Sequence, residues 1–225
     1  MPRPSRNLDR ALLAAGRALL PARGCAGLKI REVADAAGVN LGMFHYHFRT
    51  REAFLRAVLQ ATYEEMFSRL TLEMAHPGGA AASLRSALRL LGRFLRDNRS
   101  FVARVLADAL AGDAVAREFL QQNMPRHLAV LHALVAKGSE AGEFSAIAPP
   151  QALGVCIGAL ALPILFAGAL ADFGSLSKAR ALSLCETLLS DAAIDERIDL
   201  ALHAIATPKP LGTTRRAARI SGGAR

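Results

Sequence analysis

Apolar residues recur near the start of the chain with the three- and four-residue spacing of an amphipathic helix. The first such stretch predicts a helix over 8–20. The next segment, 21–27, is rich in small residues and predicts a turn that ends this helix. The second stripe consists of Ile30, Val33, Ala34 and Ala37. These four positions share one face of a helix, so the pattern predicts a second, shorter helix with one buried side.

A tight turn and a third helix are predicted directly after this stripe. Gly38 can adopt a positive φ and is therefore suited to end the second helix, and Asn40 is a good N-cap for the next one. The third helix is expected over 41–47, and Thr50 is expected to cap a long amphipathic fourth helix. The second and third helices together predict a helix-turn-helix over about 29–48. In such motifs the second helix enters the DNA major groove.

The remainder of the chain also has helical patterning, without a segment that predicts a strand. Further helices are expected over 80–98, 101–111, 113–138, 151–171, 177–190 and 191–206. Pro125 should kink the longest of them. Alanine and leucine dominate the composition, which favours helices over sheets. The predicted fold class is therefore all-α.

One segment, 152–171, has no charged residue and is long enough to cross a bilayer. It is rich in alanine and glycine, contains Pro163, and has no lysine or arginine beside it until Lys178. It also has no belt of Trp or Tyr residues at its ends. We expect a buried helix of the core and of a subunit interface, with a membrane span as the open alternative.

The net charge of +9 is unevenly distributed along the chain. Residues 1–54 contain nine Lys/Arg and four Asp/Glu, a net charge of +5. Residues 55–207 are close to neutral, at −1, and residues 208–225 contribute another +5. A local positive field is what nucleic-acid binding requires, so the charge favours the same N-terminal segment as the helix-turn-helix.

The sequence of this segment is similar to that of a known protein family. The matching residues are Ala37-Gly38-Val39-Asn40, Gly42, Phe44, Tyr46, His47, Phe48, Arg51-Glu52 and Phe54. They resemble the N-terminal DNA-binding domain of the tetracycline-repressor (TetR) family of bacterial regulators over roughly residues 8–58. The resemblance implies three parts: a DNA-binding domain over 1–54, a helical ligand-binding and dimerisation domain over 55–207, and a basic disordered tail over 208–225.

The resemblance also implies which residues contact DNA. Where the family often has a Thr or Ser cap, this chain has Leu28-Lys29, so the phosphate contact at this point should pass to Lys29 or Arg31. The candidate DNA-binding residues are Lys29, Arg31, Asn40, Leu41, Gly42, Met43, His45, Tyr46, His47 and Arg51. Outward Leu and Met side chains suit contact with a thymine methyl group.

Some of these residues have simpler interpretations. Arg31 would equally be a solvated arginine on a helix face, and His47 would equally pack beneath Phe48 as a core residue. Gly42 is expected to have a structural role that allows close approach to the backbone. Arg51 begins the fourth helix, where a cation and free N–H groups together favour an anion, so a phosphate contact is expected there.

If the family's architecture holds, the middle helices enclose a pocket for a small molecule. Its candidate lining residues are Phe94, Phe101, Phe119, Met124, His127, Leu131 and Phe166. His127 would be the polar contact in a mostly apolar lining, which suggests an apolar or amphipathic effector. For each of these residues, ordinary core packing is the alternative.

Catalytic and metal-binding patterns are not evident in the sequence. The three cysteines, Cys25, Cys156 and Cys185, have no metal-like spacing and are expected to be reduced and mostly buried, with a thiol sensor as the alternative. The six histidines also lack metal-ligand spacing. We expect no enzyme activity, no metal and no cofactor, and the N-terminus does not resemble a signal peptide.

These observations and the resemblance together predict a cytoplasmic, homodimeric transcriptional regulator, of the repressor type, that binds a palindromic double-stranded operator and responds to a small molecule. Two alternatives remain: a helical scaffold that uses its helix-turn-helix for non-specific or partner binding, and a membrane-associated helical protein.

Overall fold

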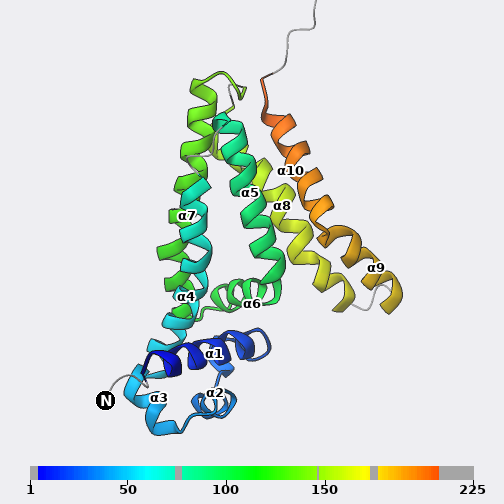
Figure 1. Ribbon diagram of the computed structural model, residues 1–225. Coiled ribbons are helices and arrows are strands. Elements are labelled where there is room, and N and C mark those ends of the chain that lie inside the picture. Colours follow the sequence, from blue (N-terminus) through cyan, green and yellow to red (C-terminus); the bar gives the residue numbers. More distant parts are fainter. Residues whose placement is uncertain (1–4, 74–77, 146, 173–176, 208–225) are drawn as a thin grey trace, which may run out of the picture.

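The computed structural model describes residues 5–73, 78–145, 147–172 and 177–207, and this part of the chain is all-α, as expected (Figure 1). Its helices are α1 (Ser5–Gly27), α2 (Ile30–Ala37), α3 (Leu41–Phe48), α4 (Arg51–Leu72), α5 (Gly79–Asp97), α6 (Arg99–Leu110), α7 (Ala114–Glu140), α8 (Pro149–Asp172), α9 (Lys178–Leu189) and α10 (Asp191–Ile205). Extended pairing in the described residues is limited to one isolated bridge between Phe144 and Ala206. The predicted basic tail lies outside the described residues.

The predicted caps fix the boundaries of the first helices. Gly38 has a φ of 67° and ends α2, and its N–H donates to the carbonyls of the last turn. The Asn40 side chain accepts the N–H of Met43 at 2.9 Å, and the Thr50 side chain accepts the N–H of Ala53 at 3.1 Å. These short-range contacts confirm the predicted starts of α3 and α4.

The turn predicted over 21–27 is shorter than expected, because α1 runs through Pro21, breaks at Gly24 and resumes for a last turn to Gly27. Gly24 has a φ of 68°, and a Cβ there would collide with the guanidinium of Arg104 on α6. The N–H of Cys25 then donates to the buried carboxylate of Asp108, also on α6, at 2.6 Å. Contacts with α6 therefore hold the end of α1 in a conformation that its own sequence does not specify.

Two apolar cores hold the molecule together. The first lies between α1, α2, α3 and the start of α4, and it extends to Phe101 and Val105 of α6 and Val115 of α7. Phe44 and Phe54 are fully buried there with ring centroids 5.0 Å apart, as expected for core residues. The second core fills the body between α4, α5, α7, α8 and α10. Figure 1 shows α6 lying across the base of the body, next to α1, so α6 belongs to both regions.

A ladder of ion pairs joins α5 and α10. Arginines spaced by four residues on α5 face aspartates spaced by four on α10. The pairs are Arg85–Asp199, Arg89–Asp195 at 2.6 Å and Arg93–Asp191 at 2.9 Å. Such partly exposed pairs each contribute only about 0.2–1 kcal/mol to the free energy of folding. The main effect of the ladder is therefore to align the two helices.

Helix α7 passes through Pro125 as one continuous helix, and α8 is the apolar helix predicted near residues 151–171. The segment Pro149–Ala167 is long and apolar enough to cross a membrane, but the core helix of a soluble protein meets the same criterion. One face of α8 packs into the body through Ala152, Cys156 and Ile164. The opposite face is exposed at Val155, Leu162 and Phe166.

Candidate functional site

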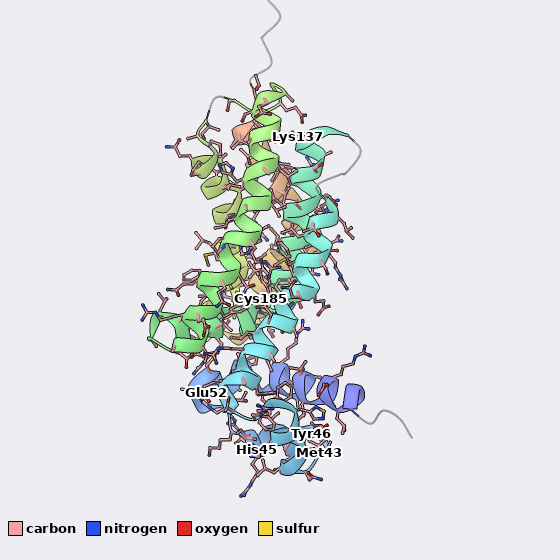
Figure 2. The ribbon with its side chains drawn as sticks, turned by 90° about the vertical axis from the view of Figure 1, so that its left-hand side faces the viewer. Met43, His45, Tyr46, Glu52, Lys137 and Cys185 are labelled. Atoms are coloured by element: carbon pink, nitrogen blue, oxygen red, sulfur yellow. The ribbon has the colours of Figure 1, made fainter. Side chains whose placement is uncertain are left out.

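Helix α3 presents a rigidly held outer face at one end of the molecule. Phe44 points inward and is fully buried, whereas the side chain of Tyr46 is 76% exposed and that of Leu41 is 39% exposed. Figure 2 shows Met43, His45 and Tyr46 together at the end of the molecule opposite Lys137. Asn40, Gly42 and His45 are also exposed, and Met43 is half-buried.

Three exposed cations lie on the segments next to α3. Lys29 and Arg31 are exposed at the start of α2, and Arg49 is exposed just after α3. Within the described residues, none of the three forms an ion pair. Lys29 provides no side-chain cap for α2, in line with the departure from the family's capping residue. Arg49 was not among the predicted residues, although its position between α3 and the Thr50 cap is visible in the sequence.

His47 points away from this face. Its side chain is only 7% exposed, and its Nδ1 lies against the carboxylate of Asp9 on α1. Its ring also lies 6.3 Å from that of Phe48. This placement favours the core alternative for His47 over a side-chain contact with phosphate.

Arg51 also points into the protein. Its guanidinium donates two hydrogen bonds to the carbonyl oxygen of Cys25, at 2.9 and 3.2 Å, and its side chain is 27% exposed. The N–H of the same Cys25 donates to Asp108. Arg51 therefore joins the start of α4 to the end of α1 and, through Cys25, to α6. Its predicted phosphate contact stays a prediction.

A second candidate site is an apolar cavity of about 350 Å³ inside the body. Six of the seven predicted residues line it: Phe94, Phe101, Phe119, Met124, His127 and Leu131. Phe166 does not, because Ile157, Ala161 and Leu165 take the inward positions of α8, which leaves Phe166 on the outer face, 53% exposed. The prediction for Phe166 is therefore wrong.

Helix α4 also contributes to this cavity, although none of its residues was predicted to line it. Leu59, Thr62, Tyr63 and Met66 line it from that helix, and their three- and four-residue spacing was a visible signal for one face. Which cavity that face meets depends on how α4 packs against α7, which the spacing does not give.

The polar groups of the cavity form one small cluster. The Tyr63 hydroxyl donates to the backbone carbonyl of Asn123 at 2.8 Å and lies 3.5 Å from Nδ1 of His127. Burial raises the pKa of Tyr63 to about 12 and lowers the pKa of His127 below its usual value of 6.5. Thr62 donates its hydroxyl to the Val58 carbonyl at 2.9 Å, so it is already satisfied.

A larger cleft of about 540 Å³ lies beside α4 and α5 and is lined by charged residues. Its arginines are already paired: Arg17 with Glu65 at 2.8 Å, Arg89 with Asp195 and Arg93 with Asp191. We therefore regard the smaller apolar cavity as the better ligand site, since it combines apolar walls with a few converging polar groups.

Metal and thiol chemistry find little support in the described residues. No group of three or more His, Cys, Asp or Glu side chains there could hold a metal ion. The three cysteines are free, with Cys25 and Cys156 buried and Cys185 half-buried. Burial raises the pKa of Cys25 to about 12 and that of Cys156 to about 11, which makes both thiols poor nucleophiles.

Comparisons with known proteins agree with this geometry. Residues 12–58 match the family model for bacterial regulatory proteins of the tetR family. The HTH-type transcriptional regulator CymR of Pseudomonas putida is 29% identical over 116 residues, which are 52% of this chain and 57% of CymR. The match thus spans little more than half of that relative.

Solved structures share the fold at lower identity. FadR from Bacillus subtilis, in complex with stearoyl-CoA, has a TM-score of 0.60 at 16% identity and covers 81% of this chain and 98% of its own. A transcriptional regulator from Saccharomonospora viridis, in complex with choline, has a TM-score of 0.67 at 19% identity and covers 89% and 98%. Residues 12–58, which include the helix-turn-helix, therefore resemble the DNA-binding domain of bacterial regulatory proteins of the tetR family, and the all-α fold of the described residues is shared with these solved structures.

Proposed function

We propose that this protein is a cytoplasmic, non-enzymatic transcriptional regulator of the repressor type. It binds a palindromic DNA operator as a homodimer and responds to a small molecule in the apolar cavity. The observation that carries the proposal is the outer face of α3, which capping fixes in place and which exposes side chains suited to a major groove.

The residues on the outer side of the helix-turn-helix domain, α1–α3, which we call the head, divide into two kinds of contact. Leu41, Met43 and His45 read base edges, with the apolar pair against thymine methyl groups. Lys29, Arg31, Tyr46 and Arg49 contact phosphates and fix the position of the head on the duplex. Asn40 and Gly42 shape the start of α3.

The outer face of α8 is the proposed dimer interface. Val155, Leu162 and Phe166 are exposed on α8 and Leu182 is exposed on the neighbouring α9. Such an apolar face is expected to be covered by another surface, and pairing with a second copy covers both faces at once through a two-fold axis. Two heads would then enter successive major grooves about 34 Å apart.

Helix α6 provides the proposed route from the cavity to the head. Phe101 and Val105 of α6 line the cavity, and Asp108 on the same helix accepts the N–H of Cys25. The Cys25 carbonyl in turn holds Arg51 at the start of α4. An effector that prefers one position of α6 would change the separation of the heads, and its differential affinity sets the size of the response.

The test is binding of the purified protein to the DNA upstream of its own gene, compared with an unrelated fragment, by fluorescence anisotropy at two salt concentrations. We expect a Kd at or below about 10⁻⁸ M for the upstream DNA and binding at least about 10³-fold weaker to the unrelated fragment. Met43→Ala and His45→Ala should change the preference among operator variants. Lys137→Ala, at the far end of α7, is the control and should change nothing.

Equal, weak and salt-sensitive binding to both fragments would instead favour a scaffold that uses the helix-turn-helix non-specifically. A protein that stays in solution only with detergent would favour the membrane-associated alternative.

A further inference from the structure

We propose that the effector is a neutral, mostly apolar molecule that donates one hydrogen bond, an alcohol or a phenol, and that Nε2 of His127 accepts this bond. The inference rests on the proposed function, because it names the chemical class that the regulatory cavity takes.

The walls of the cavity exclude charged ligands. All of its described lining residues are apolar except Thr62, Tyr63 and His127, and none is Asp, Glu, Lys or Arg. A buried ion without a partner is strongly disfavoured, whereas an apolar molecule gains from leaving water. The nearby Arg126 does not line the cavity, lies over the ring of Phe67 and is paired with Glu64. It is therefore not available to a carboxylate inside.

The hydrogen bonds around His127 determine which nitrogen is free. The Tyr63 hydroxyl has one proton, which it donates to the Asn123 carbonyl at 2.8 Å. It can therefore interact with Nδ1 of His127, 3.5 Å away, only as an acceptor. Nδ1 must then carry the ring proton, which leaves Nε2 with a lone pair.

The ring stays neutral at physiological pH, since burial lowers the pKa of His127. The side-chain contact of the ring is the one between Nδ1 and the Tyr63 hydroxyl, and the ring also interacts with the backbone of Asn123, one turn earlier on α7. Because His127 lines the cavity, a ligand that covers Nε2 should donate a hydrogen bond to it, since covering the lone pair without a donor would cost free energy.

Cavity size adds a limit on the ligand. A volume of about 350 Å³ is at the lower end of the roughly 300–1,000 Å³ usual for small-molecule sites. A fused two-ring aromatic molecule is a suitable probe of this size, and the phenylalanine side chains of the cavity favour ring contacts.

The experiment measures binding of three naphthalene probes by isothermal titration calorimetry at neutral pH. The probes are 1-naphthol, which donates a hydrogen bond, 1-methoxynaphthalene, which only accepts, and 1-naphthoate, which is an anion. We expect 1-naphthol to bind about tenfold more tightly than 1-methoxynaphthalene and at least about a hundredfold more tightly than 1-naphthoate. Choline is the cationic probe and should bind more weakly than 1-naphthol.

Substitutions at His127 assign the effect to its Nε2. In His127→Leu the preference for 1-naphthol over 1-methoxynaphthalene should fall to about one. His127→Gln keeps a polar side chain that can donate or accept, and the two probes should again converge. His132→Leu removes an exposed histidine from the same helix and should keep the preference.

The proposal is overturned if 1-naphthoate or choline binds more tightly than 1-naphthol, if no probe binds, or if the preference survives in both His127 variants. The DNA measurement is separate. Specific operator binding without probe binding would contradict the proposed ligand class and leave the proposed function unaffected. The expected probe order without operator binding would support the ligand class and contradict the regulator.

Discussion

The guanidinium of Arg51 donates two hydrogen bonds to the carbonyl oxygen of Cys25, at 2.9 and 3.2 Å. This contact joins the first residue of α4 to the end of α1, which is 26 positions away along the chain. Because α4 directly follows α3, the contact helps to determine how α3 is presented.

Arg51→Ala should therefore act through the position of the head. We expect the free energy of unfolding to fall by about 1–3 kcal/mol, as for the loss of a charge-assisted hydrogen bond. Affinity for all DNA should fall, but the dependence of log K on log salt should keep its slope. Anisotropy titrations across a salt series would measure both.

Arg31→Ala is the matched variant, since Arg31 is exposed and makes no ion pair in the described part of the chain. It should lower the salt slope by about one with little change in stability. A slope that falls for Arg51→Ala instead would establish the direct phosphate contact that the sequence alone suggests.

The exposed face of α8 predicts how the dimer can be broken. Phe166→Glu places a charge where two apolar faces would meet, so it should shift the protein from dimer to monomer at micromolar concentration. Sedimentation equilibrium would measure the shift. Leu110→Glu is the control, because Leu110 is 90% exposed on α6, away from this face. Dimers that persist in Phe166→Glu would place the interface elsewhere.

His127 predicts a loss of stability in acid. Its pKa is lowered by burial in the folded protein, so below the unfolded value of 6.5 the unfolded chain takes up a proton that the folded chain does not. The contribution of this residue is complete above that value and is lost as the pH falls below it. His127→Leu removes this dependence.

Urea denaturation from about pH 8 to about pH 5 would test the point. The difference in free energy of unfolding between the wild type and His127→Leu should decline below about pH 6.5. A difference that stays constant across this range would show that the ring is not buried as described.

The cysteines predict a specific pattern of alkylation. Burial holds the pKa of Cys25 near 12 and that of Cys156 near 11, so few thiolates form on either at about pH 8. Iodoacetamide should modify Cys185, which is half-buried, before either of the others. Peptide mass spectrometry after labelling would show the order, and the unfolded chain should react at all three positions. Early reaction at Cys25 would revive the thiol-sensor alternative.

The sequence by itself determined the elements whose cause is local. Gly38, Asn40 and Thr50 end or begin helices through contacts within a few residues, and the apolar periodicity places Phe44 and Phe54 inward. The same periodicity predicted helices close to those observed through the body. Where neighbouring residues alone determine a helix boundary or a buried face, the sequence is enough to predict it.

Tertiary structure decided the direction of side chains whose partners are distant. His47 faces Asp9, Arg51 reaches Cys25 and the end of α1 packs against Asp108, across separations that a local pattern does not encode. Phe166 shows the same limit in an all-apolar helix, where composition cannot tell an inner from an outer face and only the packing of α8 on the body does. Long-range packing thus fixed both the lining of the cavity and the link from the cavity to the head.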